Sequence, residues 1–316
     1  MRSDAERRYR SESALERVRL ARGCLPRDGL ESVVMTSEMV SDSKSRSRSR
    51  KGAGSGSALL PSAVERVGQI AARAEGRQLA VLLDCEGALA PKSGTSAASR
   101  ISESMRNTLT RLARYSVVVA ISSIACDELR KLVGVDKVFC AASEGLEVTG
   151  PGGLDLLSSR GAAALPLLDR AESAVREDLR HYRDVNIERA RLSISIKVTS
   201  KSRPVVNAAF RRACESVPGL RKTEFAGLAR LVPGAPWGRA EALPWLLAAL
   251  KVDRSRVTPI YVATHASAED AFLWLRDRGI GIAVGGHRGR TAAEYGLASR
   301  QEVEHFLKLM SSFVGW

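Results

Sequence analysis

Short apolar runs alternate with stretches of helical spacing through the first half of the sequence. Residues 79–83 form the apolar run LAVLL, which ends at Asp84, and two similar runs cover residues 116–121 and 137–142. Residues 102–115, between the first two runs, place apolar side chains on one helical face. Fully apolar strands that alternate with helices are typical of a parallel sheet covered on both faces. The pattern therefore predicts an α/β domain.

A different pattern occupies residues 147–235. A long helix is predicted over 162–183. Residues 191–198 then alternate strictly, with Leu, Ile, Ile and Val at one set of positions and Arg, Ser, Ser and Lys at the other. This alternation predicts a half-exposed strand of an antiparallel sheet. A helix over 204–217 and a strand near 225–232 complete an α+β unit.

The α/β pattern resumes towards the end of the sequence. Strands are predicted at 258–264 and 280–285, with helices before, between and after them. We therefore predict that residues 61–146 and 236–316 form one core domain. The α+β unit at 147–235 is predicted to be a cap domain inserted into this core.

Composition indicates a distinct N-terminal segment and a net positive charge. Residues 1–60 are basic and rich in Ser, Arg and Gly, which predicts a disordered N-terminal tail. The formal net charge of +14 favours anionic partners such as phosphate esters, although an arginine-rich solvated surface explains it equally well. Nucleic-acid binding through the tail is the weakest interpretation. The five cysteines include no C-x-x-C pair, which favours free thiols.

No apolar run approaches the roughly 18 residues of a membrane span. The first residues lack the apolar region of a secretory signal. We therefore expect no membrane partner and a cytoplasmic location.

Five ordered blocks resemble one family. They are LLDCEGALAP at 82–91, VVVAISSIACDELRKLVGV at 117–135, CAASEGLEVTGPGG at 140–153, VPGAPWGRAEALPWLL at 232–247 and PIYVATHASAEDAFLWLRDRGIGIAVG at 259–285. The first is similar to D-x-D-G-T-L-x-P, and the last to P-I-Y-I-G-D-D-x-T-D-E-D-A-F followed by G-I-G-I-x-V-G. Such blocks, in this order, resemble the trehalose-6-phosphate phosphatases of the haloacid dehalogenase superfamily. The resemblance covers about residues 62–312.

The resemblance implies a Rossmann-like core with a mobile cap, and hydrolysis through an aspartyl-phosphate with Mg²⁺. Asp84 matches the nucleophile, and Glu86 stands at the position of the general acid and base. Ser122 and Arg239 match the hydroxyl and the cation that hold phosphoryl oxygens. The ligands to Mg²⁺ would be Asp84, the backbone carbonyl of Glu86 and Asp270.

Many polar positions depart from the family pattern, whereas its framework glycines and aromatic residues are kept. Glu86 replaces an Asp, Ala88 a Thr and Arg239 a Lys. Thr264 and His265 replace the two Asp residues that anchor Mg²⁺. The other changed positions are Ala268, Glu144, Ser195 and Lys197.

These departures predict a pseudophosphatase that is inactive or impaired and acts by binding or regulation in trehalose metabolism. Its cleft would hold a sugar phosphate or a protein partner. The alternative is a residual phosphatase that uses Asp84 on trehalose 6-phosphate or another sugar phosphate. Because the ligands to Mg²⁺ are largely replaced, a protein without any cofactor is a further alternative. A zinc site formed by His265, Asp84 and Cys85 is a further alternative.

Overall fold

A computed structural model of the chain describes residues 60–91, 101–225, 227–234, 236–264, 268–285 and 291–313. The predicted tail lies outside the described residues except for Leu60, and so does His265.

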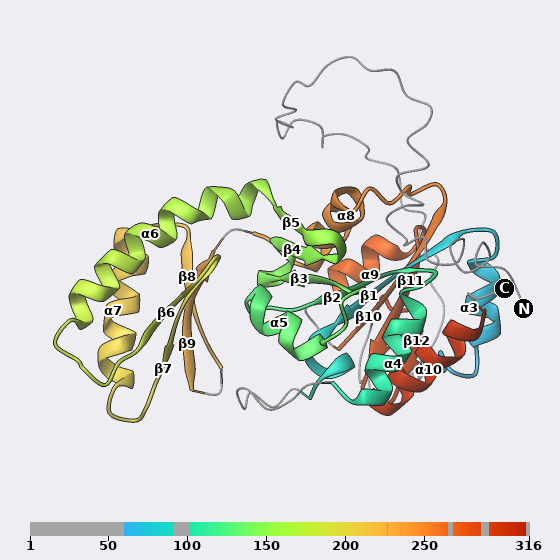
Figure 1. Cartoon of the computed structure of the whole chain (residues 1–316), viewed down its shortest axis with the longest axis horizontal. Helices are drawn as coiled ribbons and strands as arrows, with labels where there is room; N and C mark the ends of the chain where they lie inside the picture. Colours follow the sequence, from blue (N-terminus) through green and yellow to red (C-terminus); the bar gives the residue numbers. More distant parts are fainter. Residues whose placement is uncertain are drawn as a thin grey trace, which may run out of the picture. The chain divides into compact units, whose positions relative to one another are not determined.

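An eight-stranded sheet forms the core (Figure 1). Its strand order is β12-β11-β10-β1-β2-β3-β4-β5. The strands from β12 to β3 pair in parallel, whereas β4 and β5 are antiparallel to their neighbours. The strands are β1 (Gln78–Asp84), β2 (Val117–Ile121), β3 (Phe139–Ala142), β4 (Glu147–Gly150), β5 (Leu154–Leu157), β10 (Val257–Ala263), β11 (Ile280–Val284) and β12 (Tyr295–Leu297). The predicted parallel α/β core is confirmed.

Helices cover both faces of this sheet because its central strand is apolar along its length. Leu79, Val81 and Leu83 pack on one side with residues of α3, α4, α5 and α10, and Ala80 and Leu82 pack on the other with α8 and α9. The helices are α3 (Val67–Arg73), α4 (Glu103–Leu112), α5 (Cys126–Val133), α8 (Arg239–Ala249), α9 (Glu269–Leu275) and α10 (Arg300–Phe313). None of the helices that the structure describes is long and apolar enough to cross a bilayer.

A smaller antiparallel sheet has the order β6-β7-β9-β8. Helices α6 and α7 pack against it (Figure 1). Ile194 and Ile196 of this sheet join one apolar cluster with Leu168 of α6 and Phe210 of α7. The elements are α6 (Ser159–Leu179), β6 (Ile187–Ala190), β7 (Ser193–Lys197), α7 (Arg203–Ser216), β8 (Leu220–Phe225) and β9 (Leu228–Pro233). This is the α+β cap that the alternation at 191–198 predicted.

The boundary of the cap differs from the one placed at residue 147. Strands β4 and β5 pair onto β3 and so extend the core sheet. Each strand has only four residues and lies beside the GPGG stretch. The sequence there therefore predicts a turn between domains more than two strands of the sheet. By strand pairing, the separate α+β unit begins with α6.

Strand β7 is less exposed than its alternation predicts. Ser193 and Ser195 were expected on an open face of the sheet, but their residues are only 7% and 8% exposed. Ser195 is buried because it lies in register between Glu188 of β6 and Arg230 of β9, on the two neighbouring strands. Arg230 also forms an ion pair with Glu128 of α5 at 3.2 Å. Polar side chains of the two neighbouring strands therefore flank Ser195 on both sides.

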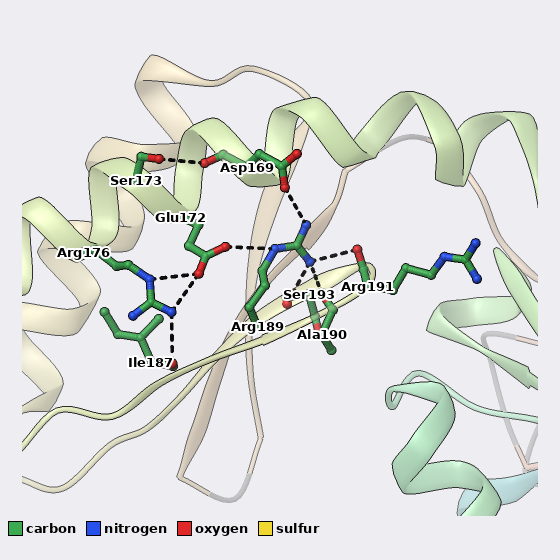
Figure 2. Close-up of polar contacts among 9 residues, drawn as sticks. All are labelled: Asp169, Glu172, Ser173, Arg176, Ile187, Arg189, Ala190, Arg191 and Ser193. Carbon is green, nitrogen blue, oxygen red and sulfur yellow. Dashed lines mark hydrogen bonds and ion pairs between the residues drawn. The ribbon is translucent and has the colours of Figure 1, made fainter.

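An arginine joins the cap sheet to its long helix (Figure 2). Arg189 of β6 contacts Asp169 Oδ1 at 3.1 Å and Glu172 Oε2 at 3.3 Å, both on α6. It also donates to the carbonyl oxygen of Arg191 at 2.8 Å. The side chains of Arg189 and Glu172 are only 19% and 22% exposed, so solvent screens this contact weakly, whereas Asp169 is 70% exposed. Arg191 points away from this cluster and pairs with Asp155 of β5.

Replacing Arg189 by methionine is expected to lower the free energy of unfolding by about 1–2 kcal/mol, because two carboxylates lose a partly buried partner. Arg176→Met is the matched control, since Arg176 shares Glu172 but is 52% exposed. The control should cost less than about 0.5 kcal/mol. Urea denaturation of both variants measures the difference. Equal losses would contradict the role given to Arg189.

Candidate active site

The carboxyl ends of three adjacent strands bring the predicted site residues together. Strand β1 lies between β10 and β2, and its last residue is Asp84. Ser122 directly follows β2, and Thr264 directly follows β10. Parallel α/β sheets place their ligand sites at this edge. Segments almost 180 positions apart in the sequence thus form one cluster.

The turn after β1 positions Glu86. Residues Cys85–Leu89 form a tight turn, in which the backbone of Glu86 and Gly87 is not helical and Gly87 has a φ of 91°. This left-handed conformation is accessible to glycine at little cost. The turn is closed by a hydrogen bond from Gly87 N to Ala90 O at 2.6 Å. Glu86 Oε1 consequently accepts a short hydrogen bond from the Ser122 hydroxyl.

Arg239 reaches the same cluster from the first position of α8. Its Nε and Nη2 donate to Asp84 Oδ1 at 3.2 and 2.8 Å. Its Nη1 donates a short hydrogen bond to Glu144 Oε2. Asp84 and Arg239 are 6% and 7% exposed, so this is a buried ion pair shared with a second carboxylate.

Glu144 is held in place through its backbone. Its N–H donates to Ser122 O at 2.9 Å, and its carbonyl accepts from Trp237 Nε1 at 3.0 Å. Its φ is 63°, and that of Ser143 is 51°. Left-handed backbone at a residue other than glycine is costly, and it persists where surrounding contacts impose it. Here these contacts direct the Glu144 carboxylate towards Arg239.

Burial dominates the electrostatics of the site. It raises the pKa of Asp84 to about 6, although Arg239 acts in the opposite direction, and the charges of Glu86 and Glu144 add to the rise. For Arg239, burial lowers the pKa, but the attraction of Asp84 and Glu144 outweighs it and leaves the pKa well above its ordinary value. Arg239 therefore stays charged at every physiological pH.

The predicted ligands to Mg²⁺ do not form a site that fits this ion. The backbone carbonyl of Glu86 accepts a hydrogen bond from Thr264 Oγ1 at 3.0 Å. Asp84 Oδ1 accepts two from Arg239, and Asp270 is exposed in the first turn of α9. Mg²⁺ requires several hard oxygen ligands in near-octahedral geometry. Within the described ranges, no group of three His, Cys, Asp or Glu side chains is arranged to hold a metal.

The remaining predicted positions stand on other elements. Ala268 is fully buried and packs with the apolar side chains beneath α8 and α9. Ser195 is buried in β7, and Lys197 is exposed at the end of the same strand. His265 lies outside the described residues, so the alternative zinc site is not described.

Cavity size does not mark this site. A hollow of ≈ 780 Å³ is lined by polar residues of α4, by Arg114 and by Lys308 of α10, and contains none of the predicted site residues. A smaller one, of ≈ 280 Å³, is lined by Gly87, Thr264 and Arg300 among others. It borders the turn after β1 but does not include Asp84. The strand ends and the buried contacts between Asp84, Arg239 and Glu144 define the site.

The family model for trehalose-phosphatase matches residues 82–301. The chain belongs to the trehalose-phosphatase family. "Probable trehalose-phosphate phosphatase D" of Arabidopsis thaliana is 28% identical over 262 residues, which are 78% of this chain and 71% of that protein.

Solved structures share the trehalose-phosphatase fold. The C-terminal domain of Candida albicans trehalose-6-phosphate phosphatase superposes with a TM-score of 0.59 at 15% identity, covering 80% of this chain and 99% of that one. The C-terminal domain of the Candida albicans trehalose synthase regulatory protein gives 0.55 at 12% identity, covering 79% and 99%.

The structure adds two contacts to the predicted trehalose-phosphatase site. Glu144 and Thr264 appeared in the sequence only as departures from the family pattern, yet Glu144 binds Arg239 and Thr264 binds Glu86. One signal could have suggested the first contact. Relative to the family pattern, position 144 gains a carboxylate while position 239 gains a guanidinium, and these two groups form favourable paired hydrogen bonds.

Proposed function

We propose that this chain is a trehalose-phosphatase homologue that does not hydrolyse phosphomonoesters and acts by binding, in the regulation of trehalose metabolism. The observation that carries the proposal is that its would-be catalytic groups are bonded to one another. Ser122 donates its only hydroxyl hydrogen to Glu86, and Arg239 directs three N–H donors to Asp84 and Glu144.

These contacts remove the functions that hydrolysis requires. A phosphoryl group needs free donors around its oxygens and an accessible nucleophile. Asp84 is almost fully buried and neutralised by Arg239. Glu86, as the hydrogen-bond acceptor of Ser122, is also poorly placed to protonate a leaving oxygen. Family membership connects the chain to trehalose metabolism.

One specific observation favours a second candidate function, a residual phosphatase. Asp84 and Glu86 retain two carboxylates, two positions apart, at the carboxyl end of β1. If the contacts of Arg239 exchanged on substrate binding, Asp84 would attack phosphorus and displace the sugar oxygen, which Glu86 would protonate. Water would then release phosphate from the aspartyl-phosphate. The substrate would be trehalose 6-phosphate or another sugar phosphate.

Phosphate release separates the two functions. The full chain is incubated with trehalose 6-phosphate and a panel of phosphomonoesters, with Mg²⁺, Mn²⁺ or Zn²⁺, beside the isosteric variant Asp84→Asn. We expect the wild type and Asp84→Asn to release phosphate at equal rates, because Asp84 does not act as a nucleophile. A working nucleophile would make the wild-type rate at least about a hundredfold higher. Asp253→Asn, at an exposed carboxylate, controls for nonspecific effects. A rate that only Asp84→Asn abolishes would establish the residual phosphatase.

Thermal shift tests the binding role. Trehalose or trehalose 6-phosphate at about ten times its dissociation constant should raise Tm by about 2–4 °C. If neither sugar shifts Tm at millimolar concentration, the connection to trehalose metabolism through this site fails.

A further inference from the structure

The buried carboxylate of Asp84 requires a compensating positive charge. A carboxylate that loses its water without a partner costs several kcal/mol, so such groups are paired or bind metals. The resemblance implies that phosphatases of this family supply that charge as Mg²⁺ together with the lysine at the position of Arg239. In this chain the guanidinium of Arg239 contacts Asp84 with two N–H groups and Glu144 with a third.

The second expected metal ligand is also satisfied within the chain. The Glu86 carbonyl oxygen accepts from the Thr264 hydroxyl at 3.0 Å. Thr264 is only 7% exposed, so this hydrogen bond is shielded from water. The threonine stands at the position where the family pattern has a metal-anchoring Asp.

Arg239 is held firmly in this arrangement. It begins α8 directly after Gly238, whose N–H donates to Glu241 Oε2 at 2.8 Å and closes the first turn. Trp237, one residue earlier, is anchored to the Glu144 carbonyl. The planar fork of an arginine can bind two carboxylates at once, which the point charge of a lysine does less well. The guanidinium is therefore fixed by both its backbone and its partners.

We propose that Arg239 is a built-in counter-cation and that this centre is independent of metal. The guanidinium supplies the positive charge at Asp84, and Thr264 satisfies the Glu86 carbonyl. The inference stands apart from the proposed loss of hydrolysis. Hydrolysis without metal would contradict the proposed loss of hydrolysis, but it would not contradict the role of Arg239 as counter-cation.

The test measures metal binding directly. The full wild-type chain is stripped with EDTA, then titrated with Mg²⁺ and Mn²⁺ by calorimetry, and its Tm is recorded with and without the metal. A site occupied at about ten times its dissociation constant would raise Tm by about 2–4 °C. We expect no binding heat and no shift for the wild type. The double variant Arg239→Lys/Thr264→Asp, which frees both oxygens and adds a carboxylate, is expected to show the shift.

The outcomes decide the proposal. Saturable binding of Mg²⁺ to the wild type that Asp84→Asn abolishes would overturn it. A folded double variant that gains no response would also count against it, because Arg239 and Thr264 would then not be what excludes the ion. If the double variant does not fold, the comparison of wild type with Asp84→Asn still decides, and Asp253→Asn serves as the exposed control.

Discussion

Replacing Arg239 by methionine is expected to lower the free energy of unfolding by about 3–5 kcal/mol. Methionine keeps much of the side-chain volume but removes the charge that two carboxylates share. Glu144 is 33% exposed and can recover water, but Asp84 is 6% exposed and cannot. The expected loss is therefore mainly the cost of leaving Asp84 unpaired in the interior.

The loss should also increase with pH. Burial already raises the pKa of Asp84 to about 6, from an ordinary value of 3.8, with Arg239 lowering it. Without the arginine, the pKa in the folded state rises further. The folded state then binds more protons than the unfolded state between the two pKa values, so its stability falls as pH rises through that window. The variant should differ less from wild type near pH 5 than near pH 8.

Chemical denaturation at the two pH values measures both effects. Arg256→Met is the matched control, because Arg256 is 85% exposed and lies 3.8 Å from Asp253. It should change the free energy of unfolding by no more than about 0.5 kcal/mol. The double variant Arg239→Met/Asp84→Asn should regain part of the stability, since the unpaired charge is gone. An Arg239→Met loss as small as that of the control would refute the buried pair.

Restoring the family residues around Asp84 is expected to create a phosphatase that depends on Mg²⁺. The set is Glu86→Asp, Ala88→Thr, Arg239→Lys, Thr264→Asp and His265→Asp. The variant should release phosphate from p-nitrophenyl phosphate at least about a hundredfold faster than the parent, the lower end of what one positioned acid contributes. A small aryl ester is chosen because Ser195 and Lys197 of the cap also differ from the family pattern.

Two comparisons make this result interpretable. Adding Asp84→Asn to the five changes should abolish the gain, and EDTA should do the same. A five-residue variant that folds, binds Mg²⁺ and stays inactive would show that Ser122 or the cap, rather than these five positions, limits the reaction. Activity of the parent equal to that of the variant would contradict the loss of hydrolysis at this site.

Local pattern was sufficient to predict most of the core. The apolar runs that became β1, β2 and β10 are buried along almost their whole lengths, and such unbroken apolar runs are typical of strands that helices cover on both faces. Strands β4, β5 and β12 were missed because each has three or four residues at or near the edge of the sheet. Such short edge strands carry little periodicity.

Local sequence also predicts some of the site residues but not the placement of others. Asp84, Glu86, Ser122 and Arg239 were identified from ordered blocks, and the structure brings all four together. Asp270 is the third expected ligand to Mg²⁺, and it is exposed on α9. Its distance from Asp84 depends on where α9 packs against the sheet, which no local pattern contains.

By itself, the sequence determined the parallel core, the α+β cap and the family, because these follow from periodicity and from residues close together in the chain. Only the tertiary structure decided what the changed residues do. Glu144 and Arg239 are 95 positions apart, and Thr264 and Glu86 are 178 apart. Their hydrogen bonds exist because parallel strands end at one edge of the sheet, where groups remote in sequence share one buried volume and must satisfy one another.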